Sequence, residues 1–248
     1  MAHSDLEALR EPHTALLRAA LELASPAGAG VALDLACGPG GTTAWLASRR
    51  RPGGLIIGLD RDAAALHAAR TTAPAASLVR ADAHRLPLRA ATVDLVWCVA
   101  ALGLFADPAA ALAEVRRLLR PGGVLVVASA TQRWVRPRHW PMALRNLSSD
   151  LSLPPADDLG ADLGAALSLA GLREVNLRAY LLDPPGLDPI AAMLPLLSWS
   201  ALAPLVVGLG PAEQAACATI AAEEPEPEPL PVLLVATGRG GDGETPVK

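Results

Sequence analysis

The fold of this chain is decided by the stretch VALDLACGPGG at residues 31–41, in which an apolar run ends in a turn of small residues. A helical pattern follows from Thr42 to Arg50. Together they predict a buried strand, a tight loop and a helix N-terminus, an arrangement that holds nucleotide-like ligands. Glycines let backbone approach such a ligand because they carry no Cβ. Asp34 lies ahead of the glycines, where a carboxylate repels a pyrophosphate and suits a ligand with positive charge.

Strands and helices alternate outward from this stretch up to residue 128. Apolar runs bounded by turn residues predict strands at 31–35, 55–60, 77–82, 92–99 and 124–128. Helices are expected between them, with Asp62 and Asp107 as N-caps and the sequence RPGG at 120–123 closing the last one. The alternation predicts an α/β fold, a doubly wound, Rossmann-like parallel sheet with helices on both faces. A sixth strand is expected at 172–182 and a last one at 230–238.

The chain of 248 residues is long enough for one such domain, which we expect to cover 1–239. Within it, 1–27 reads as a helical cap split or opened at Pro12, and 131–160 as a lid-like insertion with a short helix at 141–151. Residues 184–229 read as a helical segment, with helices at 189–200 and 211–222, followed by an acidic proline-rich spacer. The tail 240–248 is predicted to be disordered.

Composition excludes several classes of function. The net charge is −4 and no basic stripe is present, so nucleic acid is not expected as a partner. No apolar run reaches the length of a membrane span, and no signal peptide precedes the domain, so we expect a cytoplasmic protein that binds no membrane. Three cysteines, Cys37, Cys98 and Cys217, lack CxxC spacing, so neither a metal site nor a disulfide framework is expected.

Three carboxylates fall at the carboxyl ends of successive predicted strands. Because ligands of doubly wound sheets bind at that edge, Asp34, Asp60 and Asp82 should surround one site. Asp60 suits a pair of ribose hydroxyls, since an ionised carboxylate can accept two hydrogen bonds. Asp82 can accept from an adenine amino group, and the Ala83 N–H can meet a ring nitrogen. Asp34 and the loop backbone would then face the amino-acid end of an adenosyl ligand.

Five motifs in this order resemble those of class I S-adenosylmethionine-dependent methyltransferases, of the small-molecule type 11 branch. They are LDLACGPG at 33–40, GLD at 58–60, RADA at 80–83, VDLV at 93–96 continuing to Asp107-Pro108, and LLRPGGVL at 118–125. The resemblance implies S-adenosylmethionine as cofactor, S-adenosylhomocysteine as product, a small-molecule acceptor and an antiparallel seventh strand. It implies a set of cofactor-binding residues, namely Asp34, Ala36, Gly38, Gly40, Asp60, Arg61, Asp82, Ala83 and Cys98.

The sequence departs from the family pattern at two places. Ala36 stands where glycine is frequent, and the stretch after the fourth strand, ALGLF at 101–105, lacks the histidines often found there, which predicts an apolar lining. The sequence assigns no catalytic base. His139 and His13 are the candidates considered, while His84 reads as an adenine-side or surface residue. Trp134 and Trp140 either stack on a planar acceptor or pack the lid onto the body.

Other functions compete with methyl transfer to an O, N or C atom of a small, apolar or aromatic metabolite. A nicotinamide oxidoreductase expects G-x-G-x-x-G with no carboxylate just ahead of it, which fits residues 34–43 poorly. A protein of this fold can also bind the cofactor yet catalyse a cyclisation or serve as an accessory subunit. Methylation of a macromolecule is disfavoured by the charge and by the lack of an appended domain. The apolar stretch 184–209 covers an acceptor, forms a homodimer face, or is plain helical packing.

Overall fold

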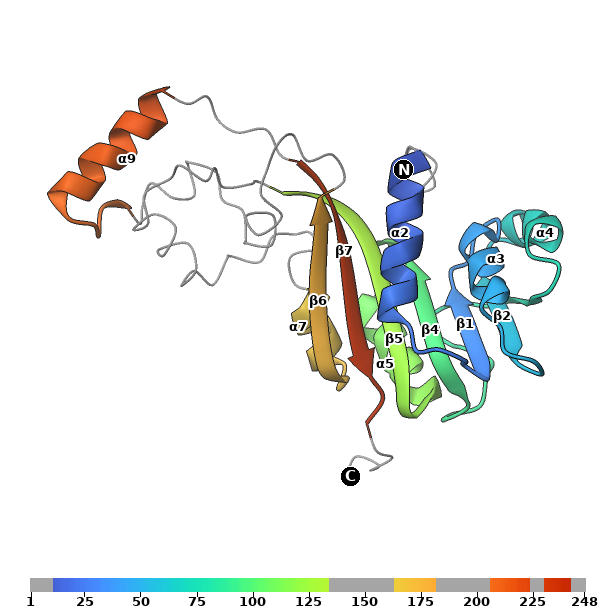
Figure 1. Ribbon diagram of the computed structural model, residues 1–248. Coiled ribbons are helices and arrows are strands. Elements are labelled where there is room, and N and C mark those ends of the chain that lie inside the picture. Colours follow the sequence, from blue (N-terminus) through green and yellow to red (C-terminus); the bar gives the residue numbers. More distant parts are fainter. Residues whose placement is uncertain (1–10, 134–162, 182–205, 224–229, 242–248) are drawn as a thin grey trace. The chain divides into compact units, whose positions relative to one another are not determined.

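The protein contains a seven-stranded sheet. The computed structural model describes residues 11–133, 163–181, 206–223 and 230–241, and its strands follow the order β3-β2-β1-β4-β5-β7-β6 (Figure 1). The strands are β1 (Val31–Leu35), β2 (Leu55–Asp60), β3 (Ser77–Arg80), β4 (Val93–Val99), β5 (Leu119–Arg133), β6 (Arg173–Leu181) and β7 (Leu230–Arg239). Neighbours from β3 to β5 pair in parallel, and β7 runs in the opposite direction, which confirms the predicted fold class.

Two of the described helices, α4 and α5, begin at the N-caps that the sequence predicts. They are α2 (Glu11–Ala24), α3 (Gly41–Ser48), α4 (Ala63–Thr72), the short 3₁₀ helix η1 (Leu102–Leu104), α5 (Pro108–Leu118), α7 (Leu163–Leu169) and α9 (Pro211–Glu223). Asp62 accepts a hydrogen bond from the Ala64 N–H at 2.8 Å, and Asp107 accepts one from the Ala110 N–H at 2.9 Å. Both N-cap predictions are confirmed, and Pro108 occupies the first helical position, where its missing N–H costs nothing.

Apolar side chains cover both faces of the sheet. On one face, Leu33 and Leu35 belong to a buried cluster that includes Leu112 of α5 and Leu167 of α7. Figure 1 shows α2 on the opposite face from α5. On that side Trp97 of β4 is fully buried, and its indole N–H donates to the Ser25 hydroxyl at 2.8 Å just beyond α2. This two-sided burial fixes the strand ends that carry the site.

The fifth strand differs from the prediction. We expected a turn at 120–123 and a strand from Val124, but the strand already begins at Leu119, which pairs with Val93. The register then shifts so that Leu95 pairs with Val124, which makes 120–123 a bulge inside the strand. Gly122 has φ +74°, and a Cβ on Gly123 would lie 2.9 Å from the Val93 carbonyl oxygen. The proline and glycines therefore break the pairing locally without ending it.

The chain divides into two compact units. Of the described residues, 11–129, 163–177 and 234–241 belong to one unit, and 130–133, 178–181, 206–223 and 230–233 to the other. Strands β1 to β4 and the site described below lie in the first unit, to which most of β5, β6 and β7 also belongs. The single domain expected over 1–239 stays a prediction. Several predicted features fall outside the described residues: the segment before 11, most of the lid with the 141–151 helix, the 189–200 helix, the acidic spacer at 224–229 and the tail at 242–248.

Candidate functional site

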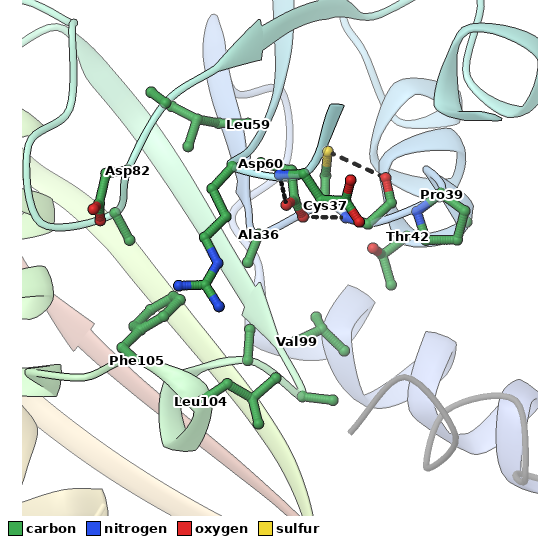
Figure 2. Close-up of a pocket in the computed structure, with 18 of the residues that line it drawn as sticks. Ala36, Cys37, Pro39, Thr42, Leu59, Asp60, Asp82, Val99, Leu104 and Phe105 are labelled. Carbon is green, nitrogen blue, oxygen red and sulfur yellow. Dashed lines mark hydrogen bonds between the residues drawn. The ribbon is translucent and has the colours of Figure 1, made fainter. Parts of the chain in front are cut away.

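A cavity of about 520 Å³ lies at the carboxyl ends of β1 to β4, where the fold places ligands. Figure 2 shows Asp60, Asp82 and Thr42 around one side of it and the apolar Val99, Leu104 and Phe105 across from them. The walls come from the ends of four strands, from α2 and α3, and from the loops after β3 and β4. The lining residues are Thr14, Leu17, Ala36, Cys37, Gly38, Pro39, Gly41, Thr42, Trp45, Leu59, Asp60, Arg61, Asp62, Ala81, Asp82, Ala83, His84, Val99, Ala100, Ala101, Leu104 and Phe105.

Asp60 organises the glycine loop from the neighbouring strand. Its Oδ2 accepts from the Gly38 N–H at 2.8 Å, and its Oδ1 accepts from the Asp62 N–H at 2.9 Å. The Cys37 N–H in turn donates to the Leu59 carbonyl at 3.0 Å. Each carboxylate oxygen can accept more than one hydrogen bond, so both oxygens keep acceptor capacity for a ligand in the cavity.

Asp34 is held behind the wall of the cavity. Only 1% of its surface is exposed, and its Oδ2 accepts hydrogen bonds from the hydroxyls of Thr43 at 2.6 Å and Thr42 at 2.9 Å. Burial raises the pKa of Asp34 to about 6, an effect opposed by the two threonine hydroxyls and reinforced by the charge of Asp60. Thr42 lines the cavity, so its hydroxyl stands between the Asp34 carboxylate and the cavity.

Asp82 lies beyond the end of β3, which closes at Arg80 rather than at residue 82 as expected. Its Oδ1 accepts from the His84 backbone N–H at 2.9 Å and lies 2.6 Å from the His84 Nδ1. These hydrogen bonds hold the pKa of Asp82 below its usual range. The carboxylate therefore stays ionised on the cavity wall, ready to accept from a donor group.

Neither cysteine near the site is suited to nucleophilic chemistry. Cys37 lines the cavity, and burial, reinforced by the charges of Asp34 and Asp60, raises its pKa to about 12. Burial also raises the pKa of Cys98 to about 12. Since the thiolate is the reactive form, both thiols are inert at neutral pH.

Six of the nine predicted cofactor residues meet on the cavity wall: Ala36, Gly38, Asp60, Arg61, Asp82 and Ala83. Three do not. Asp34 lies behind Thr42. Gly40 has φ +88° and packs on α4, where a Cβ would come within 3.0 Å of the Ala69 Cβ. Cys98 points into the core cluster on the α5 side, because side chains alternate along β4 and Val99 takes the cavity position.

Several lining residues were not predicted. Thr42 and Trp45 stand three residues apart on α3, a spacing that places them on one helix face. Thr14 and Leu17 share the same spacing on α2, whereas Leu104 and Phe105 line the cavity as predicted for the apolar stretch 101–105. Helical periodicity could have paired Thr42 with Trp45 and Thr14 with Leu17, but it does not tell which face of a helix meets a ligand. His13 falls in the first turn of α2, whereas Trp134, His139 and Trp140 lie outside the described residues.

Ala36 adopts a left-handed backbone conformation with φ +56°. Alanine in that region is strained by about 1–2 kcal/mol, which explains why glycine is frequent at this turn. We expect Ala36→Gly to raise the free energy of unfolding by about 0.5–1 kcal/mol, since relief of strain outweighs the added chain entropy of the unfolded state. Urea denaturation measures this. Ala91→Gly, at φ +53° away from the cavity, should behave alike, and a loss of stability in both variants would refute the strain.

Comparisons with known proteins agree with this geometry. A family model described as "Methyltransferase domain" matches residues 33–127. An uncharacterized methyltransferase of Synechocystis is 32% identical over 157 residues, which are 60% of this chain and 69% of that protein. A trans-aconitate 2-methyltransferase of Azoarcus is 40% identical over 99 residues, 40% of this chain and 38% of that enzyme. The crystal structure of the [4+2]-cyclase SpnF shares the fold, with a TM-score of 0.57 and 21% identity over 93% of this chain and 82% of that one.

The sheet order, the antiparallel last strand and the glycine loop held by Asp60 define a Rossmann-like methyltransferase domain. The chain belongs to the class I S-adenosylmethionine-dependent methyltransferases, in the type 11 branch. The chain spans between 29% and 38% of the length of the first curated relatives it matches. Among the described helices, none is both long and apolar enough to cross a membrane. Within the same residues, no group of His, Cys, Asp and Glu could hold a metal ion.

Proposed function

We propose that this protein binds S-adenosylmethionine in the cavity and transfers its methyl group to an O, N or C atom of a small, neutral, apolar or aromatic acceptor. The observation that carries the proposal is the gathering of Asp60, Asp82 and the glycine loop around one cavity at the carboxyl ends of β1 to β3. Its volume of about 520 Å³ lies within the usual range of small-ligand pockets.

The residues present fit an adenosyl cofactor along its whole length. Asp60 keeps acceptor capacity for ribose hydroxyls. Asp82, exposed and ionised, would accept from the adenine amino group, and the Ala83 N–H would meet a ring nitrogen. The N-terminus of α3 at Gly41 faces the cavity and would hold the amino-acid carboxylate. The negative charge of Asp34 lies directly behind the Thr42 hydroxyl on the wall and would complement the positive charge of the ligand.

Bound S-adenosylmethionine supplies an electrophilic methyl group on a sulfonium. The chain's own contribution is to align the acceptor and exclude water, and such orientation alone can be worth about 7–11 kcal/mol. Among the described lining residues, Cys37 is a protonated thiol and both ring nitrogens of His84 have hydrogen-bond partners. Those residues therefore favour orientation over general-base catalysis, while His139 and His13 stay candidates from the sequence.

The acceptor would lie against the apolar part of the wall. Leu17 of α2, Trp45 of α3 and Leu104 of η1 line it, and Leu104 is 53% exposed although it faces the cavity. Trp45 offers a flat face for stacking. This wall supports an apolar or aromatic acceptor rather than the carboxylate substrates that the names of the trans-aconitate methyltransferase relatives indicate.

The alternative is a protein that binds the cofactor but catalyses a step other than methyl transfer, such as a cyclisation, or serves as an accessory subunit. The described lining residues orient a substrate and supply no general base, which favours this alternative as much as it favours methyl transfer. Incubation with cofactor labelled in the methyl group and candidate metabolites separates the two functions. Label that appears in a product supports methyl transfer, and a converted substrate without label supports the alternative.

Asp60→Ala provides the test of the cofactor. We expect the dissociation constant of S-adenosylhomocysteine to rise at least 100-fold, because two charge-assisted hydrogen bonds to the ribose are lost and the Gly38 N–H is released. Isothermal titration calorimetry measures it. Glu22→Gln removes the same charge from the exposed far end of α2 and should bind as the wild type does. Saturable binding of NADH, with no heat from S-adenosylhomocysteine, would overturn the proposal.

A further inference from the structure

His84 connects the loop after β3 to the loop after β4. Its Nδ1 lies 2.6 Å from the Asp82 Oδ1, and its Nε2 accepts a hydrogen bond from the Asp107 backbone N–H at 3.2 Å. Its ring also meets the Phe105 ring edge-on, with 6.0 Å between the centroids. One side chain thus holds three groups that come from both sides of the cavity.

The hydrogen-bond partners of His84 determine which of its ring nitrogens donates and which accepts. A backbone N–H can only donate, so the Nε2 facing Asp107 must carry a lone pair. A carboxylate can only accept when ionised, so the Nδ1 facing Asp82 must carry the proton. The bridge therefore requires the neutral imidazole with its proton on Nδ1, and protonation of Nε2 would remove the bond to Asp107.

The loop that His84 contacts is also anchored in the core, because Ala101 and Leu102 belong to the buried cluster. It leaves β4 through Ala100, which has φ +51° and donates its N–H to the Ala128 carbonyl at 2.7 Å. It then passes through η1 and presents Leu104 and Phe105 to the cavity before α5 begins. Asp107 is the N-cap of α5, so the bond from its N–H to His84 fixes the point where this loop ends.

We propose that His84, in its Nδ1-protonated neutral form, is a positioning residue that ties Asp82 to the Phe105 loop and so sets the width of the purine-binding part of the cavity. This inference rests on the proposed function for the identity of the ligand. The bridge itself depends only on the ligand-free protein. A bridge must hold at both ends, so loss of either bond should weaken cofactor binding as much as loss of both.

Three variants test this at the two ends. His84→Asn keeps a donor near Asp82 and loses the acceptor for the Asp107 N–H, His84→Gln does the reverse, and His84→Phe keeps the ring but loses both bonds. We expect each to raise the dissociation constant of S-adenosylhomocysteine by roughly tenfold, the effect of one hydrogen bond of about average strength. His67→Asn, on the exposed side of α4, is the matched control and should have no effect. The thermal midpoint of each variant is measured alongside, so that a folding defect is recognised.

If the fold-increase of the dissociation constant in His84→Phe equals the product of the fold-increases in His84→Asn and His84→Gln, the two contacts act independently. That result would overturn the bridge. Binding by His84→Phe as tight as the wild type would overturn it as well. A long-range ¹H–¹⁵N spectrum of the ligand-free protein gives a second reading, and we expect the Nδ1–H tautomer. The Nε2–H tautomer would refute the inference. If the wild type does not bind S-adenosylhomocysteine, the proposed function fails, while the tautomer still decides whether the bridge exists.

Discussion

Asp34→Asn is expected to make the ligand-free protein more stable at pH 7.5 and to weaken its binding of S-adenosylhomocysteine. The carboxylate is buried, and its pKa is raised from 3.8 to about 6. A shift of that size corresponds to about 3 kcal/mol of destabilisation by the ionised group at neutral pH. Asparagine keeps an acceptor oxygen for the hydroxyls of Thr42 and Thr43 and carries no charge to desolvate. We therefore expect a gain of about 1–3 kcal/mol in the free energy of unfolding.

The pH dependence gives this prediction its sign. Because the pKa of Asp34 is higher in the folded state than in the unfolded state, the penalty on stability is absent below about pH 4, where Asp34 is protonated in both states. It grows as the pH rises from 4 to 6 and is fully present above 6. The advantage of the variant should therefore be large at pH 7.5 and should shrink at pH 4.5. Urea denaturation at both pH values measures it. Asp107→Asn, an exposed N-cap for which asparagine is an equal substitute, is the control and should show little change at either pH.

We expect binding to weaken although stability rises. The ammonium group at the amino-acid end of S-adenosylhomocysteine loses the negative charge behind Thr42, and we expect the dissociation constant to rise about tenfold or more. A gain in stability together with a loss of binding would show that the buried charge of Asp34 lowers the stability of the fold and serves ligand binding. If the variant is no more stable at pH 7.5, or equally more stable at both pH values, Asp34 does not carry the proposed charge.

The local features of this fold were predictable because they depend on neighbours in the sequence. A cap such as Asp62 or Asp107 needs only the N–H groups of the next turn, and both were found from the sequence. The strand ends followed from apolar runs, so the three aspartates could be placed at one edge. The bulge at 120–123 could not, because it arises from pairing with Val93 and Leu95 on another strand.

The side chains behind the wall show the same limit. Nothing in the motif tells that Asp34 turns to Thr42 and Thr43 rather than to the ligand, because that choice depends on where α3 packs on the sheet. Cys98 was predictable in part. Alternation along a strand places it opposite Trp97 and Val99, and a choice of Val99 as the cavity residue would have sent Cys98 to the core. Which face holds the ligand still had to come from the structure.

Asp94 gives the largest expected loss of stability. It is 6% exposed at the start of β4, where its Oδ2 accepts from the N–H groups of Gly30 at 2.8 Å and Val31 at 2.7 Å. Its Oδ1 contacts the guanidinium of Arg120. Asp94→Ala leaves two N–H groups without their acceptor, and we expect the free energy of unfolding to fall by about 3–5 kcal/mol. Urea denaturation measures the loss.

Asp94→Asn supplies a milder test should the alanine variant not fold. Its amide keeps one acceptor oxygen, so we expect a loss of about 1–3 kcal/mol. Asp34→Asn is the matched comparison, because it replaces a buried aspartate on the adjacent strand in the same way. We expect Asp34→Asn to raise the free energy of unfolding and Asp94→Asn to lower it. Asp94 stands at the strand end opposite the cavity, so folded Asp94→Asn should bind S-adenosylhomocysteine as the wild type does. An unchanged stability would contradict the stabilising role of the Asp94 hydrogen bonds. A loss of binding as large as that of Asp34→Asn would contradict a purely structural role and place the two aspartates in one coupled network.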